Sequence, residues 1–212
     1  MPKTLQDIEI RPAVKSDIAA MTAALDRAFS EDDPFGEYMF PDPAKRARAQ
    51  PRLTRAMIRH QYLPLGGAHV ATVDGVVAGG MLWKPPGYRF GPLRYLASIP
   101  EFTWAMGAGG PRVLAVDSAI GKIATGLPHC FGVTLGVDPH RQQSGVGSAL
   151  LQFAITEIEK AAVPALCLCK DGNVGYYELF GGQRLGRIRL GRSGPQINVM
   201  MWLPSSLKSD RV

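Results

Sequence analysis

One segment in the second half of the chain reads Asp138-Pro139-His140-Arg141-Gln142-Gln143-Ser144-Gly145-Val146-Gly147-Ser148-Ala149-Leu150-Leu151. It joins a predicted buried strand at 129–137 to an amphipathic helix expected at about 145–161. Glycines let the backbone bend tightly and approach a ligand closely. The first amides of a helix carry partial positive charge and have no partner inside the helix. The segment therefore predicts a phosphate-binding turn at the start of this helix.

Two familiar phosphate loops do not fit the segment. The dinucleotide fingerprint requires a third glycine, and Leu150 stands at that position. The nucleoside-triphosphate loop requires Gly-Lys-Ser/Thr, and Gly147-Ser148-Ala149 lacks the lysine. From the residues alone, a plain strand-to-helix turn that binds nothing stays open as the alternative.

The elements after the glycine segment are regular. An apolar run at 165–169 predicts a strand parallel to the one at 129–137, because a strand, helix and strand of this length form a right-handed crossover. A short helix is expected near 173–180. Two further strands, at about 183–190 and 196–203, are expected to flank a turn at 191–195.

The first half predicts a strand at 8–11, followed by a helix for which Ser16 offers an N-cap. The acidic segment 30–43 contains three prolines and is expected to be a loop. A helix is expected at about 44–61, with Pro51 either in its first turn or breaking it in two. Asp74-Gly75 lies between two apolar runs at 69–73 and 76–83, which is typical of a β-hairpin.

These elements predict one domain over residues 1–212. Its fold class is α/β (α+β), with a mixed central sheet of about six to seven strands and helices on both faces. The segment at about 84–128 is rich in glycine and proline. We interpret it as a helical insertion, with short helices near 93–106 and 113–125.

Composition narrows the classes of function. Apolar residues make up 46 % of the chain, enough for a sizeable core, and no apolar run reaches the roughly 18 residues that span a bilayer. The N-terminus shows no signal peptide, and three cysteines argue against a disulfide framework. We therefore expect a cytoplasmic protein with no membrane partner. A homodimer is one of the assemblies open to it.

The net charge of +6 is compatible with nucleic acid, a membrane surface or an anionic small ligand. The basic residues form no dense run, and those at helical spacing (Arg48, Arg52, Arg55 and Arg59) are best interpreted as a solvated helix face. No nucleic-acid partner is expected. Cys167 and Cys169 share one face of a strand, and without a nearby His or Cys cluster we expect buried apolar side chains there and no metal site.

Two blocks resemble the GNAT N-acetyltransferase superfamily. Gln142, Gly145 and Gly147 match its pattern Gln/Arg-x-x-Gly-x-Gly/Ala, and the segment 173–181, Asn-Val-Gly-Tyr-Tyr-Glu-Leu-Phe-Gly, resembles Asn-x-x-aromatic-Tyr-Glu-x-x-Gly-Phe. The run Pro128-His129-Cys130-Phe131 is similar to the Pro-His-aromatic-aromatic of the puromycin N-acetyltransferase-like branch. The resemblance implies a GNAT-like domain with a splayed strand at an acyl-CoA site, and acetyl-CoA as co-substrate.

The resemblance also implies a role for each matching residue. The backbones of Leu135, Gly136 and Val137 would bind the pantetheine arm, and Asn173 would hold the arm by its side-chain amide. Tyr177 would act as general acid on the leaving thiolate, and Tyr176 would line the cofactor pocket. The pyrophosphate would be bound by the loop and the first helical residues: Gln142, Gln143, Ser144, Gly145, Val146, Gly147 and Ser148.

The general base stays open between the acidic residues of the first loop (Glu31, Asp32, Asp33 and Glu37) and His129. The sequence departs from the branch in two places. No acid occurs in Cys167-Leu168-Cys169-Lys170, where the branch often has a glutamate, and Gly181-Gly182 replaces the usual Gly-Phe.

Two hypotheses of function follow. The first is an N-acetyltransferase that moves an acetyl group from acetyl-CoA to a primary amine of a small molecule by direct attack. The second is a non-catalytic acyl-CoA-binding or regulatory module on the same scaffold. The segments 30–43 and 84–128 would build the acceptor pocket, and neither contains a pattern that identifies the acceptor.

Overall fold

The structure is a computed structural model that describes residues 7–123 and 128–208. The first half begins with a strand and three helices and ends in the hairpin and the insertion. Its elements are β1 (Ile8–Pro12), α1 (Ile18–Ala28), α2 (Pro34–Met39), α3 (Pro43–Ala56), β2 (Ala68–Val73), β3 (Val76–Lys84), α4 (Pro92–Met106) and α5 (Gly110–Gly121). Short helical turns lie at Lys15–Asp17, Leu63–Leu65 and Gly107–Gly109, and a π-helical segment, η2, continues α3 over Met57–Tyr62.

The second half alternates strands and helices as the sequence predicts. Its elements are β4 (Cys130–Val137), α6 (Val146–Ala161), β5 (Ala165–Cys169), α7 (Val174–Leu179), β6 (Gln183–Arg189), β7 (Gln196–Trp202) and α8 (Ser205–Lys208). Short 3-10 turns at Pro139–Arg141 and Asp171–Asn173 precede α6 and α7.

The described residues form one seven-stranded sheet in the order β1-β2-β3-β4-β5-β7-β6. The pairing of β4 with β5 is parallel, and the other pairings are antiparallel. The mixed sheet and the single domain confirm the predicted fold class. The hairpin turn is also confirmed, since Asp74 and Gly75 both have positive φ, at 52° and 77°.

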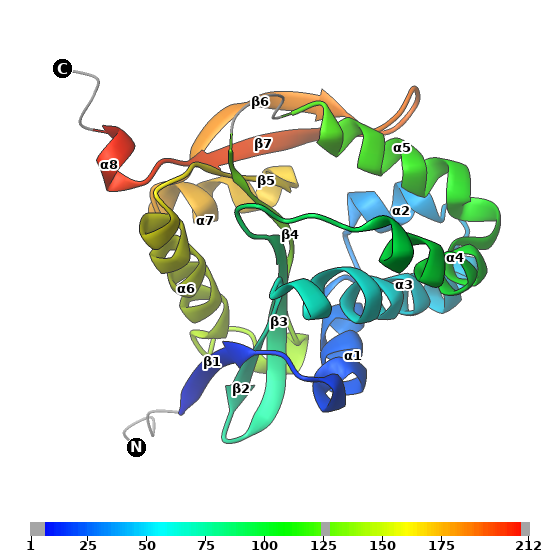
Figure 1. Cartoon of the computed structure of the whole chain (residues 1–212), viewed down its shortest axis with the longest axis horizontal. Helices are drawn as coiled ribbons and strands as arrows, with labels where there is room; N and C mark the ends of the chain where they lie inside the picture. The colour runs from blue at the N-terminus through cyan, green and yellow to red at the C-terminus, as the bar shows by residue number, and fades with distance from the viewer. Residues whose placement is uncertain (1–6, 124–127, 209–212) are drawn as a thin grey trace.

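Helices cover both faces of the sheet (Figure 1). On one face, α6 and α7 pack over the centre, where Val146, Leu150 and Leu151 bury against Met81 and Trp83. On the other face, α1 and η2 cover β2 and β3, and α2 and α5 cover β6 and β7. Helices α1 and α6 each bury a row of apolar side chains, which explains why they pack against the sheet.

Strands β4 and β5 separate after a short common start. Only Cys130, Phe131 and Gly132 of β4 have partners in β5, namely the residues Ala165, Leu166 and Cys167. On its other side β4 stays paired with β3 to Val137, with a bulge that leaves Val133 without a counterpart between Leu82 and Trp83. A gap therefore opens between the last five residues of β4 and the end of β5, and this is the predicted splayed strand.

Three local expectations are wrong. Ser16 does not cap α1, because it lies inside the 3-10 turn Lys15–Asp17. The Val14 amide, at the start of that turn, donates a hydrogen bond to the Asp17 carboxylate. The segment 30–43 is not wholly a loop, because Asp33 caps α2 with Pro34 at its first position. Pro51 neither starts nor breaks α3. It lies in the interior of a continuous helix, where its neighbour Gln50 is buried.

The insertion between β3 and β4 places α4 against α3. Arg52 stacks on the Trp104 ring at 4.1 Å from its centroid, and Arg55 and Arg59 each lie 3.5 Å from the Glu101 carboxylate. Three of the four arginines at helical spacing therefore contact α4 in addition to facing solvent. Within the described residues, none of the helices combines the length and the apolar character that crossing a lipid bilayer requires.

Candidate functional site

The glycine loop turns the chain sharply from β4 into α6. Gln143 and Gly145 both have positive φ, at 60° and 91°, and Gly145 is the N-cap of α6 without a side-chain cap. The first intrahelical bond runs from the Ala149 amide to the Gly145 carbonyl at 2.9 Å. The amides of the three preceding residues (Val146, Gly147 and Ser148) thus have no partner inside the helix. They lie where the sequence predicts a phosphate-binding turn.

The loop is fixed by a buried carboxylate that we did not identify from the sequence. Asp138 Oδ2 accepts two hydrogen bonds from the Arg27 guanidinium of α1, at 2.9 and 2.6 Å. Its Oδ1 accepts one from the His140 amide at 3.0 Å. The hydrogen bonds from Arg27 lower the pKa of Asp138 below its usual range, since they stabilise the ionised form. An aspartate before proline at a strand end is a turn signal, whereas Arg27 has no local signal.

Two side chains of the loop bond back to its own backbone. Gln142 Nε2 donates to the Val137 carbonyl at 3.4 Å, and Ser144 Oγ donates to the Arg141 carbonyl. Both side chains therefore shape the loop. What Gln142 and Ser144 contribute to a ligand beyond that shape stays a prediction.

The edge of β4 presents backbone groups to the gap. The Asp138 amide donates a hydrogen bond to the Ala78 carbonyl of β3 at 2.9 Å, so Asp138 and Ala78 are a hydrogen-bonded pair of the antiparallel ladder. Because such pairs alternate along an antiparallel ladder, Leu135 and Val137 direct their N–H and C=O groups away from β3 and into the gap. Gly136 points the other way and pairs with Gly80. Its missing side chain makes room for Leu25 and Phe29 of α1, because a Cβ would lie within 2.9 Å of each.

Two tyrosines of α7 lie beside the gap. Tyr177 packs edge-on against Trp202, with ring centroids 5.4 Å apart. Burial among apolar neighbours raises the pKa of Tyr177 above its usual value. Tyr176 reaches the start of α6 instead, where its hydroxyl is 3.3 Å from Ser148 Oγ. Asn173 lies at the end of the 3-10 turn before α7, at the N-cap position of that helix.

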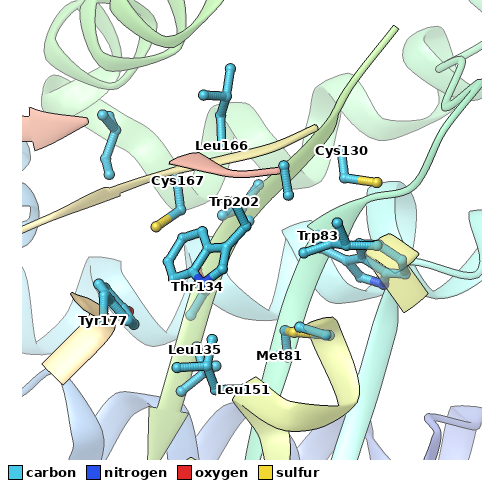
Figure 2. Close-up of a pocket in the computed structure, with 16 residues that line it drawn as sticks. Met81, Trp83, Cys130, Thr134, Leu135, Leu151, Leu166, Cys167, Tyr177 and Trp202 are labelled. Carbon is cyan, nitrogen blue, oxygen red and sulfur yellow. The ribbon is translucent and has the colours of Figure 1, made fainter. Parts of the chain in front are cut away.

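A cavity of about 70 Å³ lies between the separated strands, α6 and α7 (Figure 2). Residues of both strands meet there with Tyr177, and Figure 2 shows Tyr177 and Trp83 at opposite ends with Trp202 between them. The lining residues are Met81, Trp83, Cys130, Gly132, Val133, Thr134, Leu135, Leu151, Ala154, Ile158, Ala165, Leu166, Cys167, Leu168, Tyr177 and Trp202.

The cysteines near the gap are free thiols with little tendency to ionise. Burial raises the pKa of Cys130 and of Cys169 to about 11, and burial also raises the pKa of Cys167. A thiol must ionise to act as a nucleophile, so the three cysteines are poor candidates for covalent catalysis. Among the described residues, no three His, Cys, Asp or Glu side chains are grouped so as to hold a metal ion.

The acidic loop residues have different environments. Asp32 forms an ion pair with Lys170 at 2.6 Å, which joins the first loop to the end of β5. Asp33 accepts hydrogen bonds from the Phe35 amide and from Gln50, and burial raises the pKa of its carboxyl. Glu31 and Glu37 are exposed. Lys170 belongs to the stretch 167–170, in which the sequence has no acid, and the ion pair with Asp32 gives this lysine a structural role.

No protein-family model matches the chain, and no curated protein matches it. Solved structures do. A Corynebacterium glutamicum protein of the class "histone acetyltransferase HPA2 and related acetyltransferase" superposes with a TM-score of 0.67 at 23 % identity, over 93 % of this chain and 97 % of that one. The Drosophila melanogaster polyamine N-acetyltransferase, which forms N-acetylagmatine, superposes with a TM-score of 0.65 at 17 % identity, over 93 % and 100 % of the two chains.

A third structure, an agmatine N-acetyltransferase in its apo form, gives a TM-score of 0.65 at 14 % identity, over 93 % of this chain and 99 % of that one. Likeness at these identities concerns the fold. The chain therefore shares the fold of these acetyltransferases along nearly its whole length, which agrees with the architecture inferred from the two sequence blocks.

Proposed function

We propose that this protein is an N-acetyltransferase that transfers an acetyl group from acetyl-CoA to a primary amine of a small molecule. One observation supports it above all. The gap between β4 and β5 opens beside the first amides of α6, which have no partner inside the helix, and beside Tyr177. The same gap therefore offers a place for the diphosphate, the pantetheine arm and the thioester of acyl-CoA.

The residues fit acetyl-CoA. A Cβ on Gly147 would lie 3.4 Å from Tyr176 Oη and 3.6 Å from Val137 Cγ2, so glycine leaves the amides accessible where a large side chain would cover them. The amides from Gln143 to Ser148 would bind the pyrophosphate. The backbone groups of Leu135 and Val137 would pair with the arm, and Asn173 would hold it by its amide. Acetyl-CoA, when bound, supplies an activated acyl group as a thioester.

In the proposed reaction, the protein contributes backbone N–H groups of β4 and the hydroxyl of Tyr177. Backbone N–H groups at the edge of β4 would stabilise the oxyanion formed when the amine attacks the carbonyl carbon. Tyr177 Oη would then donate its proton toward the leaving sulfur. Because burial raises the pKa of Tyr177, the phenol stays protonated throughout the working pH range and acts first as a hydrogen-bond donor to that sulfur.

The acceptor we infer is a cationic small-molecule amine. Agmatine and polyamine acetyltransferases are among the structural neighbours. In this chain, the exposed carboxylates of Glu31 and Glu37 give the first loop a negative character that attracts such amines, whereas Asp32 is paired with Lys170. The more specific relation to the puromycin N-acetyltransferase-like branch rests on the sequence motif at 128–131. The cytoplasmic location likewise rests on composition.

The decisive experiment is a thiol-release screen with acetyl-CoA against polyamines, agmatine, aminoglycosides and peptide N-termini. Amine-dependent release of CoA, with mass spectrometry of the acetylated product, supports the enzyme. Acetyl-CoA binding without turnover for every amine supports the non-catalytic acyl-CoA-binding module instead.

A further inference from the structure

The cavity between β4 and β5 extends beyond the place that the proposed reaction requires. Its near part is lined by the separated strands and Tyr177, where the thioester would lie. We call far part the side of the cavity under α6, where β4 and β5 are paired, and assign to it the lining residues Met81, Trp83, Leu151, Ala154, Ile158 and Trp202. In Figure 2 the side chains of Tyr177 and Trp83 lie at opposite ends of the group of lining residues.

Small residues leave the far part open. Gly132 and Ala165 stand at the junction of the two strands, and Ala154 faces the cavity from α6. Protein interiors are packed nearly as densely as organic crystals, and unfilled apolar volume destabilises a fold. A cavity that measures about 70 Å³ in all and continues between the sheet and α6 is therefore a feature that a ligand group explains better than packing does.

The walls of the far part suit hydrocarbon. The indole N–H of Trp202 is already used, because it donates to the Phe180 carbonyl at 3.0 Å. The Trp83 indole nitrogen has no partner in the part of the chain that the structure describes, and it is buried. A water molecule needs two to four polar partners, and these walls offer fewer. An alkyl group has no such requirement.

We propose that the far part is an acyl-chain pocket, so that the enzyme, besides acetyl-CoA, takes acyl-CoA donors with a longer chain and uses them more efficiently. This inference rests on the proposed function. The cavity, near and far parts together, measures about 70 Å³, several times the roughly 10–15 Å³ that a single water molecule requires, so it has room for an acyl group longer than acetyl. The chain would run from the sulfur beside Tyr177 toward Trp83. The reaction is unchanged: the thioester bond breaks, an amide bond forms, and the thiol leaves with one proton.

The test measures kcat/KM for acetyl-, butyryl-, hexanoyl- and decanoyl-CoA with one accepted amine. We expect butyryl- and hexanoyl-CoA to exceed acetyl-CoA by at least about tenfold, because each methylene that the apolar pocket buries is worth about tenfold or more, and decanoyl-CoA to fall off. A steady fall from acetyl-CoA onward overturns the inference but leaves the acyltransferase intact.

A pair of variants locates the chain. Ala154→Leu fills the far part from α6, where leucine is nearly as good a helix former as alanine. It should reduce kcat/KM for hexanoyl-CoA by at least about tenfold and leave acetyl-CoA nearly unchanged. Thr156→Leu adds the same side chain at an exposed position of the same helix and should change neither value. Equal losses for both donors in Ala154→Leu would contradict the assignment.

A binding measurement separates the two proposals. Calorimetry compares hexanoyl-CoA with free CoA on the wild-type protein, without any amine. Tighter binding of hexanoyl-CoA than of free CoA, with no turnover for any amine, would support the acyl-chain pocket and contradict the proposed acyltransferase activity. Equal binding of the two ligands removes the acyl pocket, whatever the turnover.

Discussion

Replacing Gly147 by leucine should abolish tight acetyl-CoA binding while the protein still folds. Gly147 lies in the first turn of α6 and is not among the residues with positive φ, so a side chain is compatible with its backbone. One methyl group fits, because a Cβ would make ordinary contacts at 3.4 Å with Tyr176 Oη and at 3.6 Å with Val137 Cγ2. The longer leucine side chain must extend beyond these neighbours, in front of the amides.

The size of the effect follows from the hydrogen bonds that the covered amides lose. A hydrogen bond to a charged group contributes about 1.5–3 kcal/mol. If leucine keeps the pyrophosphate from two amides, binding weakens by about 3–6 kcal/mol, which is roughly a 10²- to 10⁴-fold increase in Kd. Gly147→Ala is the matched control. It should keep the affinity and raise the free energy of unfolding by about 0.5–1 kcal/mol, because alanine is the better helix former.

Isothermal titration with acetyl-CoA measures the affinity of the three proteins, and urea unfolding confirms that each is folded. The reasoning fails if Gly147→Leu binds acetyl-CoA as tightly as the wild type does. It also fails if Gly147→Ala loses as much affinity as Gly147→Leu, because the effect would then come from the helix and not from the covered amides.

Three further predictions concern neighbouring residues. Tyr177→Phe should lower turnover by about 10²- to 10⁴-fold with unchanged acetyl-CoA affinity, whereas Tyr176→Phe should lower turnover far less. A thiol-release assay measures turnover, and calorimetry measures the affinity. Equal losses of turnover in the two variants would show that Tyr177 is not the general acid. Arg27 lowers the pKa of Asp138, so the ionised pair stabilises the fold above the unfolded pKa of about 3.9, and that contribution disappears as the pH falls through the lower folded value. In Asp138→Asn, the free energy of unfolding should therefore be about 1–3 kcal/mol lower at neutral pH and should fall less steeply as the pH is lowered. Unfolding followed by circular dichroism at a series of acid pH values measures both effects. A variant with the same pH profile of stability as the wild type would contradict the anchoring role. Gly145→Ala forces an L-residue to φ 91° and should cost about 1–2 kcal/mol in thermal unfolding, whereas an unchanged midpoint would mean that the loop relaxes.

Patterns local in the sequence predicted most of the fold. The Asp74-Gly75 turn, the strand before the glycine loop and the helix after it each follow from a few adjacent residues. Features that depend on distant contacts were predicted wrongly, such as the position of Pro51 within its helix. A proline inside a helix costs about 3 kcal/mol, yet α3 continues through Pro51, with Gln50 bonded to the Phe29 carbonyl and Leu53 buried. Tertiary packing outweighs the local preference there.

The candidate site divides in the same way. The loop and the two tyrosines were identified because they lie in short motifs. The residues that fix them were not, because Arg27 and Asp138 are 111 positions apart and Asp32 and Lys170 are 138 apart. No periodicity or spacing connects such pairs. The cavity under α6 likewise arises only when Ala154, Ala165 and Gly132 come together from three elements.

The central claim is that the start of α6 and the open edge of β4 form one acyl-CoA site. An acetyl-CoA titration followed by amide chemical shifts in a two-dimensional nitrogen–proton NMR spectrum tests it most directly. The largest changes should occur at the amides from Gln143 to Ser148 and at Leu135 and Val137. Saturable changes confined to other parts of the surface, or no change at all in a well-folded sample, would contradict the claim.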